Sequence, residues 1–306
     1  MNTLVTGASG FIGRTLLSQL SNEKVTGLAR GPKACSSAVN WVSFDLEELL
    51  EGKTIHGEYD TVVHLAARAH ILNDKSKKPL EDFLRFNKDV SLELAKQMFH
   101  KGMKRFVFVS SIGVNGSKTR KGEIFSEDSI PMPVTDYGKS KFEAENGLRI
   151  LSEELGFELV VIRPPLVYGK GAPGNFGQLI KLMRTRLPLP FGYVYNRKSF
   201  VSVNNLANFI AICCKHPNAS NKTFLIADDG TISTRDLLVE LSDNKTLLLP
   251  VPSFILHSFL CCLGRKKMST QLLSDLVIDN SYAKQELDWK PLETTKEALN
   301  KIVADW

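Results

Sequence analysis

Residues 5–13 read VTGASGFIG, and this stretch decides the fold. An apolar run of strand character precedes it, and FIGRTLLSQL follows with its apolar residues spaced as on one helix face. Gly7, Gly10 and Gly13 are therefore expected at a strand-to-helix turn. There the missing side chains let the backbone turn tightly, approach a pyrophosphate and pack a helix on a sheet. The stretch predicts a dinucleotide site, with an ordinary glycine-rich turn as the alternative. Its G-x-x-G-x-x-G spacing differs from the G-x-G-x-x-G of the commonest dehydrogenases.

The chain up to about residue 168 alternates strand-like and helix-like segments, which predicts a doubly wound α/β sheet. Gly102 and Gly156 stand where helices should stop. Strands are expected near residues 3–6, 24–28, 40–42, 61–65, 105–110 and 158–163, and helices near 11–20, 80–100 and 137–155.

Tyr137 and Lys141 form a Y-x-x-x-K step on a predicted helix, where residues four apart share a face. An ammonium beside a phenol favours phenolate, so the pKa of Tyr137 is expected to fall toward working pH and suit acid–base catalysis. The predicted strand FVFVSS ends upstream in Ser110 and Ser111, at the sheet edge where ligands collect. An incidental surface pair, with Ser111 as a simple turn residue, is the alternative.

Taken together, the motifs resemble those of the extended short-chain dehydrogenases/reductases, which include nucleotide-sugar epimerases, dehydratases and reductases. They occur in the family's order: TGASGFIG at 6–13, FDL at 44–46, VVHLAA at 62–67, FVFVSS at 106–111, YGKSK at 137–141 and RPPLVYG at 163–169. The resemblance implies that Ser111, Tyr137 and Lys141 are the catalytic trio and that Asn87 supports the active site. It also implies a set of cofactor contacts: Gly7, Ser9, Gly10, Phe11, Ile12, Gly13, Asp45, Leu46, Leu65, Ala66, Ala67, Asn87, Ser110, Pro164, Leu166 and Val167.

The fold expected from this resemblance is a Rossmann-type doubly wound parallel sheet with a smaller α+β C-terminal substrate lobe. After Gly169 the chain becomes rich in Gly and Pro around a short predicted helix, and SFVSVNNLANFIAICCKHP with KTFLIAD looks like a return to the sheet. Residues 1–168 plus about 199–228 are expected to bind the cofactor. Residues 169–198 plus 229–306 are expected to form the lobe.

The end of the second predicted strand bears on the choice between NAD and NADP. An acidic residue there commonly binds the ribose 2′-hydroxyl of NAD, whereas NADP binders supply Arg. In VTGLARGPK, Ala29 takes the acidic position, and Arg30 and Lys33 follow. NADP(H) is therefore favoured over NAD(H), with an ordinary solvent-facing loop as the alternative.

Within the family, SSIGVNG, RPPLVYG, GNFGQL and LPLPFG…RKSFVSVNNLA are similar to bacterial 4-keto-reductases of O-antigen and capsule synthesis. The implied reaction converts UDP-2-acetamido-2,6-dideoxy-4-hexulose to UDP-N-acetylquinovosamine. A 4-epimerase that retains its cofactor and a non-enzymatic NADP-sensing protein are the alternatives. The implied substrate contacts are Asn175 and Phe176 at the diphosphate, Arg197 or Lys198 on a phosphate, and Asp275 on the uridine ribose. Where relatives carry an arginine before that Asp-Leu step, this chain has Gln271 and Leu272.

The composition of the 306-residue chain agrees with a large core and an anionic small-molecule ligand. It is 43% hydrophobic, with net charge +6 and a pI near 9.0. Nucleic acid is not expected, because no basic run is interleaved with aromatics, and KSKK at 75–78 and GRKK at 264–267 read as solvated loops. A homodimer is possible.

The chain opens on a strand, so no signal peptide is expected, and no apolar stretch reaches the roughly 18–20 residues of a membrane span. Residues 253–264, SFILHSFLCCLG, are apolar nearly all round and predict a helix buried in the lobe, with a membrane or partner surface as the alternative. The odd cysteine count without zinc spacing indicates free buried thiols, no metal site and a cytoplasmic protein. The cysteines are Cys35, Cys213, Cys214, Cys261 and Cys262.

Overall fold

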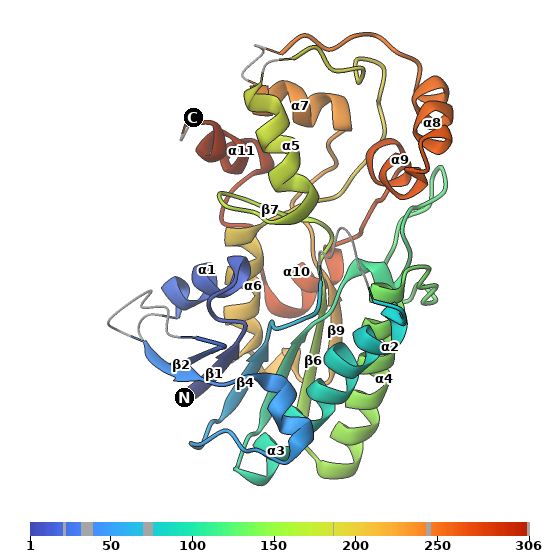
Figure 1. Ribbon diagram of the computed structural model, residues 1–306. Coiled ribbons are helices and arrows are strands. Elements are labelled where there is room, and N and C mark those ends of the chain that lie inside the picture. Colours follow the sequence, from blue (N-terminus) through green and yellow to red (C-terminus); the bar gives the residue numbers. More distant parts are fainter. Residues whose placement is uncertain (21–22, 32–38, 70–75, 186, 243–245, 305–306) are drawn as a thin grey trace.

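The computed structural model describes residues 1–20, 23–31, 39–69, 76–185, 187–242 and 246–304 (Figure 1). At its centre is a parallel sheet of seven strands in the order β3-β2-β1-β4-β5-β6-β9. The order reverses between β1 and β4, as in doubly wound sheets, which confirms the expected fold class. The strands are β1 (Asn2–Thr6), β2 (Lys24–Ala29), β3 (Asn40–Ser43), β4 (Thr61–His64), β5 (Arg105–Val109), β6 (Glu158–Arg163) and β9 (Lys222–Leu225).

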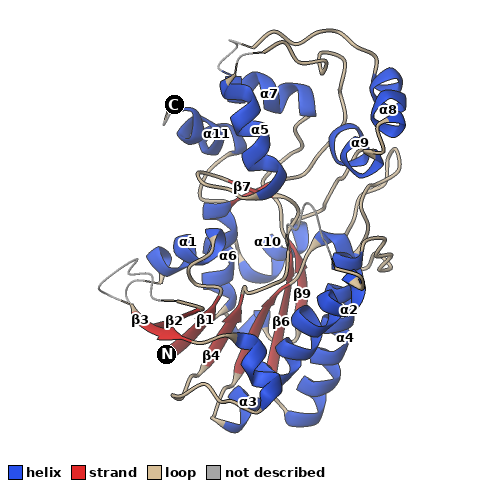
Figure 2. Ribbon diagram, viewed as in Figure 1, coloured by secondary structure: helices blue, strands red, loops and turns tan. Residues whose placement is uncertain are grey.

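Helices cover both faces of the sheet (Figure 2). Alternate residues of β5 enter opposite cores: Val107 and Val109 pack in one, Phe106 and Phe108 in the other. Burial on both faces explains why the central strands read as continuous apolar runs. The first core lies under α1 (Phe11–Gln19) and α6 (Val203–Cys213); the second lies under α3 (Val90–His100) and α4 (Asp136–Leu155).

The helix expected over residues 80–100 has an interruption in its middle. It consists of α2 (Pro79–Leu84), the π-helical turn η2 (Arg85–Asp89) and α3. The predicted helix stops are confirmed, since Gly102 and Gly156 have φ of +90° and +85°, and the Gly156 N–H donates to the Ser152 carbonyl oxygen at 2.9 Å.

A second layer of helices stands above the C-terminal edge of the sheet (Figure 1). Its own core contains Phe176, Leu238 and Leu299, and the short pair of β7 (Val167–Tyr168) with β8 (Val201–Ser202) lies at its base. The helices of this lobe are α5 (Gly174–Arg184), α7 (Thr234–Ser242), α8 (Ser253–Cys262), α9 (Lys266–Leu273) and α11 (Thr295–Val303). Part of the segment expected in the lobe, α10 (Ser281–Leu287) and Trp289, packs against the sheet instead.

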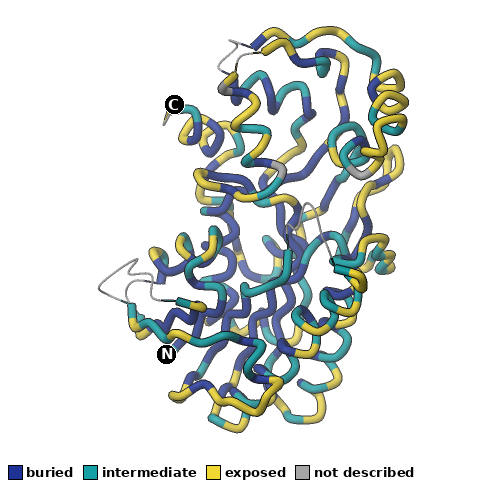
Figure 3. The backbone as a smooth tube through the Cα atoms, viewed as in Figure 1, coloured by how far each residue is buried: buried dark blue, intermediate teal, exposed yellow. Residues whose placement is uncertain are grey.

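The expectation that residues 253–264 are buried is wrong. In α8 only Leu256 is buried, whereas Phe254 and Phe259 are 70% and 60% exposed. The lobe core is already filled by α5, α7 and α11, and α8 packs against α9 at its margin (Figure 3). None of the helices among the described residues is long and apolar enough to cross a bilayer.

The cysteines differ in burial according to the helix that carries them. Cys213 and Cys214 are buried free thiols, as expected. Cys261 is half-buried and Cys262 is exposed, so the prediction of burial is wrong for this second pair, because it belongs to α8. Cys35 lies outside the described residues.

A buried ion pair fastens the helix α4 to the ends of two strands. The Arg163 guanidinium at the end of β6 binds Glu145 of α4 through two nitrogens, at 3.0 and 2.6 Å. The Ser110 hydroxyl after β5 donates to the same carboxylate at 2.5 Å, and Arg163 also donates to Asn115 Oδ1 at 3.1 Å. The side chains of Glu145 and Arg163 are only 1% and 5% exposed. Because water cannot solvate either charge, each one is stabilised by the opposite charge of its partner.

We expect Glu145→Gln to lower the free energy of unfolding by about 3–5 kcal/mol, because it leaves the Arg163 charge buried without a counterion. Chemical denaturation measures this loss. Glu143→Gln is the matched control, since Glu143 lies exposed on the same helix, and it should change stability by less than about 0.5 kcal/mol. Equal losses in the two variants would contradict the role of the pair.

Candidate active site

The glycine loop between β1 and α1 turns so tightly that a side chain at Gly7 or Gly13 would collide with neighbouring backbone atoms. Gly7 has φ +66°, and its carbonyl oxygen accepts the Gly10 N–H at 2.9 Å. A Cβ on Gly13 would lie 2.4 Å from that oxygen, and one on Gly7 would lie 2.8 Å from the Ala66 nitrogen. Gly10 caps α1 without a side-chain hydrogen bond, so the first N–H groups of the helix are available to an anion. This bare backbone cradle at a helix N-terminus fits a dinucleotide pyrophosphate.

The other residues expected at the cofactor follow the C-terminal ends of the strands. Asp45 caps the 3₁₀ turn η1 (Leu46–Glu51), and its side chain accepts the Glu47 N–H at 3.2 Å. The Leu46 side chain is buried in the core, so only the main chain of Leu46 is left for a cofactor contact. Arg30 is exposed directly after β2. Lys33 lies outside the described residues. The remaining positions lie in the turn and first helical turn after β1, after β4 and after β6: Ser9, Phe11 and Ile12; Leu65, Ala66 and Ala67; Pro164, Leu166 and Val167.

The segments that carry Ser111 and Tyr137 meet at a close contact between two glycines. Ser111 caps the 3₁₀ turn η3 (Ile112–Val114), its hydroxyl oxygen accepting the Gly113 N–H at 3.1 Å. Tyr137 lies in the first turn of α4, where a Cβ on Gly138 would come within 2.5 Å of the Gly113 carbonyl oxygen. Only glycine at 138 lets α4 begin this near to η3.

Lys141 projects from α4 into the protein, where its side chain is almost completely buried. Its Nζ donates to the Val109 carbonyl oxygen at 2.9 Å and lies 4.4 Å from the centre of the Phe108 ring. Burial lowers the pKa of Lys141 to about 7, although the nearby Glu145 carboxylate opposes the shift. The lysine can therefore gain or lose its charge near neutral pH.

The expected fall in the pKa of Tyr137 is wrong in direction. Its ring lies edge-on to Phe83 with 6.2 Å between centroids, and burial raises the pKa to about 12. The Lys141 ammonium does not offset this, because it is engaged by the Val109 carbonyl and the Phe108 ring. The phenol is consequently protonated at neutral pH, which is the form that can donate a proton.

Asn87 links the loop after β4 to the catalytic helix. Its side chain accepts from the Arg68 N–H at 2.8 Å and donates to the Ser140 hydroxyl at 2.9 Å; Ser140 in turn donates to the Tyr137 carbonyl oxygen at 2.8 Å. Asn87 lies in the π-helical turn η2, a distortion that is frequent at functional sites. The expected supporting role of Asn87 thus has a structural path to Tyr137.

Two supporting residues were missed by the sequence reading, although both lie inside its motifs. Ser140 is the serine of YGKSK, and its hydrogen bonds need the fold to become visible. His64 of VVHLAA is buried between the hydroxyls of Thr6 and Ser91, at 2.7 and 2.9 Å. Burial lowers the pKa of His64 to about 3, so the ring is neutral and structural.

On the lobe side, the structure groups three of the residues expected at the substrate. The Arg197 N–H donates to Asp275 Oδ1 at 2.8 Å, and burial lowers the pKa of the neighbouring Lys198 to about 8, with Asp275 opposing the shift. Asn175 lies in the first turn of α5. The ring of Phe176 is buried 5.8 Å from Tyr168, so any contact of Phe176 with substrate must come from its main chain.

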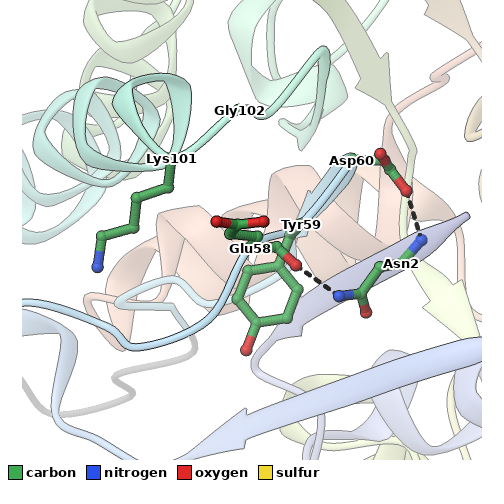
Figure 4. Close-up of a pocket in the computed structure, with 6 residues that line it drawn as sticks. All are labelled: Asn2, Glu58, Tyr59, Asp60, Lys101 and Gly102. Carbon is green, nitrogen blue, oxygen red and sulfur yellow. Dashed lines mark hydrogen bonds between the residues drawn. The ribbon is translucent and has the colours of Figure 1, made fainter.

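A surface cavity of about 500 Å³ lies at the opposite edge of the sheet (Figure 4). It is lined by Asn2, Glu58, Tyr59, Asp60, Lys101 and Gly102. Asp60 already accepts the Asn2 N–H at 2.7 Å, and the strands begin here, whereas ligands of open α/β sheets bind at the strand ends. The glycine loop and the predicted catalytic trio therefore mark the candidate active site.

These features define a nicotinamide-dependent enzyme built on a doubly wound sheet. The family model described as "NAD dependent epimerase/dehydratase family" matches residues 3–227. The chain belongs to this family, the extended short-chain dehydrogenases/reductases, and is an NAD(P)-dependent enzyme acting on a nucleotide sugar.

Known relatives include both epimerases and reductases. A UDP-glucose 4-epimerase of Vibrio cholerae is 37% identical over 97% of this chain and 93% of its own. A dTDP-4-dehydro-6-deoxyglucose reductase of Escherichia coli is 22% identical over 98% and 96%. The structure of RMD from Pseudomonas aeruginosa complexed with NADPH aligns with a TM-score of 0.78 at 21% identity, covering 100% of this chain and 99% of that one, which is a likeness of fold.

The pKa of Lys141 makes the stability of the protein depend on pH. Between about pH 7 and about pH 10 the unfolded chain carries a proton on Lys141 that the folded protein has released, so folding is favoured as pH rises through this window and disfavoured as it falls. We expect the stability difference between wild type and Lys141→Met to rise with pH there, as measured by urea denaturation. Lys139→Met, at an exposed position of the same helix, should show a flat difference. A flat difference for Lys141→Met would contradict the shift.

Proposed function

We propose that the protein reduces the C4 ketone of a UDP-4-keto-6-deoxy-hexosamine with NADPH, in bacterial surface-polysaccharide biosynthesis. The observation that carries this proposal is the end of β2. Ala29 stands where NAD binders place a carboxylate, and the exposed Arg30 follows. A site open to a 2′-phosphate suits a reductase, which takes up fresh NADPH at each turnover.

The protonation state of Tyr137 supports reduction. With its pKa raised to about 12, the phenol holds the proton that the ketone oxygen must receive. Ser111 Oγ accepts from Gly113 N–H, which leaves its own hydrogen available to donate to the same substrate oxygen. Lys141, held by the Val109 carbonyl oxygen and the Phe108 ring, has a pKa of about 7, so its protonated fraction is proposed to support the developing alkoxide. The nicotinamide, when bound, supplies the hydride.

The binding roles of the remaining residues belong to the same proposal. Residues 1–168 plus about 199–228 would hold NADP(H). Residues 169–198 and most of 229–306 would hold the nucleotide sugar. Arg197 or Lys198 is proposed to bind a phosphate, Asp275 the uridine ribose, and Asn175 with the main chain of Phe176 the diphosphate; the grouping of Arg197, Lys198 and Asp275 supports a common site.

A 4-epimerase with a retained cofactor is the second candidate, and the 37% identical relative named UDP-glucose 4-epimerase favours it. Both reactions use a tyrosine proton and a nicotinamide hydride, so the catalytic trio serves either one. They differ in the fate of the cofactor, since an epimerase returns the hydride to the sugar and a reductase releases oxidised cofactor. The non-enzymatic alternative conflicts with family membership and the intact trio.

The two reactions can be separated in one assay. We expect the purified protein to consume one NADPH for each UDP-4-keto-6-deoxy-hexosamine reduced, followed at 340 nm with NMR of the product, and to leave UDP-N-acetylglucosamine unchanged. Tyr137→Phe removes the transferable proton and should lower turnover by about 10²–10⁴-fold while NADPH binding persists. Interconversion of UDP-N-acetylglucosamine and its galacto epimer without added cofactor would overturn the reductase proposal in favour of the epimerase.

The cofactor preference has its own test. The double variant Ala29→Asp with Arg30→Asn introduces an acidic group at the end of β2 and removes the cation. The ratio of kcat/KM for NADPH over NADH should therefore fall by about tenfold or more. Lys24→Asn removes a cation from the exposed start of the same strand and serves as the control. An unchanged ratio in the double variant would mean that the 2′-phosphate is not bound here.

A further inference from the structure

The outer side of α8 carries an unusual concentration of exposed apolar side chains. Phe254, Ile255 and Phe259 are 70%, 48% and 60% exposed, and Leu263, directly after the helix, is 56% exposed. Ile255, Phe259 and Leu263 follow one another at intervals of four, the spacing of neighbours on one helix side, and Phe254 precedes Ile255. We call these four residues the α8 face; α8 itself lies at the margin of the lobe (Figure 1).

The α8 face is fixed in place and left uncovered. On its inner side, Leu256 is buried and His257 Nδ1 lies 2.8 Å from the Ser269 hydroxyl of α9, so the helix is held against α9. The segment before α8 adds two more exposed apolar side chains, Leu247 at 62% and Leu249 at 40%. Scattered apolar residues on a surface are ordinary, but such a grouping marks a contact surface.

The charges that lie nearest to this face in the sequence are basic. Residues 246–274 contain no Asp or Glu. Arg265 and Lys266, at the turn into α9, are exposed. The loop with exposed Lys118, Arg120 and Lys121 adjoins the chain after α9, since the Thr119 N–H donates to the Asp275 carbonyl oxygen at 2.9 Å. Glu123, an exposed acidic residue of that loop, accepts from the Arg120 N–H at 2.6 Å.

We propose that the α8 face docks the protein onto the surface of an anionic lipid bilayer. Exposed large apolar side chains can enter the acyl boundary of a membrane while basic residues beside them meet anionic headgroups. Since no described helix can span a bilayer, the attachment is peripheral and reversible. The docking does not depend on which sugar reaction the enzyme performs.

A second copy of the chain fits this face less well. In a two-fold symmetric dimer the same patch meets itself, so Arg265 and Lys266 of one copy would approach those of the other. With no carboxylate in residues 246–274, nothing in the patch neutralises these cations. An anionic headgroup supplies the missing negative charge, and a second copy does not.

Vesicle flotation with the full-length protein tests the docking. Wild type should float with phosphatidylethanolamine/phosphatidylglycerol vesicles at about 0.1 M salt and lose most of this binding at about 1 M, where the Debye length falls to about 3 Å. Phosphatidylcholine vesicles should bind far less. Phe254→Glu with Phe259→Glu, and separately Arg265→Gln with Lys266→Gln, should each lower the partition coefficient by about tenfold or more.

Leu292→Glu is the matched control, because Leu292 is 61% exposed beside α6, away from α8, and should float like wild type. Circular dichroism and melting curves check that all variants are folded. Failure of wild type to float with anionic vesicles, or equal flotation of the Phe254/Phe259 variant, would overturn the proposal. A dimer in sedimentation velocity that this variant abolishes, without vesicle binding by wild type, would assign the face to a second copy.

Discussion

The buried pair of Glu145 and Arg163 holds together the part of the molecule that contains the candidate active site. It joins α4 to the end of β6, and through the Ser110 hydroxyl to the end of β5, directly before Ser111. A buried ion pair gains little net stability over an apolar contact, because both charges must leave water. Its value lies in geometry: a carboxylate with several donors permits one arrangement of helix and strands, and that arrangement carries Ser111, Tyr137 and Lys141.

The same packing sets the electrostatics of the trio. The apolar surroundings that hold α4 against the sheet raise the pKa of Tyr137 and lower that of Lys141, so both groups favour their neutral forms. The phenol and the ammonium are thus governed more by the core beneath them than by each other. Asn87 and Ser140 complete this arrangement by fixing the first turn of α4 to the loop after β4.

Much of the fold was predictable because local chemistry and tertiary structure agree in the N-terminal half. Strands buried on both faces read as apolar runs, Gly156 stops α4, and Gly7, Gly10 and Gly13 leave the space that the turn requires. Ser111, Tyr137 and Lys141 were selected from their motifs, and their catalytic roles stay a prediction. The direction of the Tyr137 pKa shift did not, because it depends on what surrounds the ring. The exposure of α8 also escaped prediction, since its composition matches a core helix and only the filling of the lobe core by other helices leaves it outside.

The return of the chain to the sheet has a consequence for how the protein is made. β9 pairs with β6, yet the segment between them in the sequence contains α5 of the lobe, the short pair β7–β8 and α6. The core under α1 further contains Phe209, Phe224 and Trp289, so an emerging chain that ends near residue 168 lacks the groups that cover this face. During synthesis the nucleotide-binding half therefore stays incomplete until almost the whole polypeptide has left the ribosome, and its apolar side is exposed to chaperones throughout that interval.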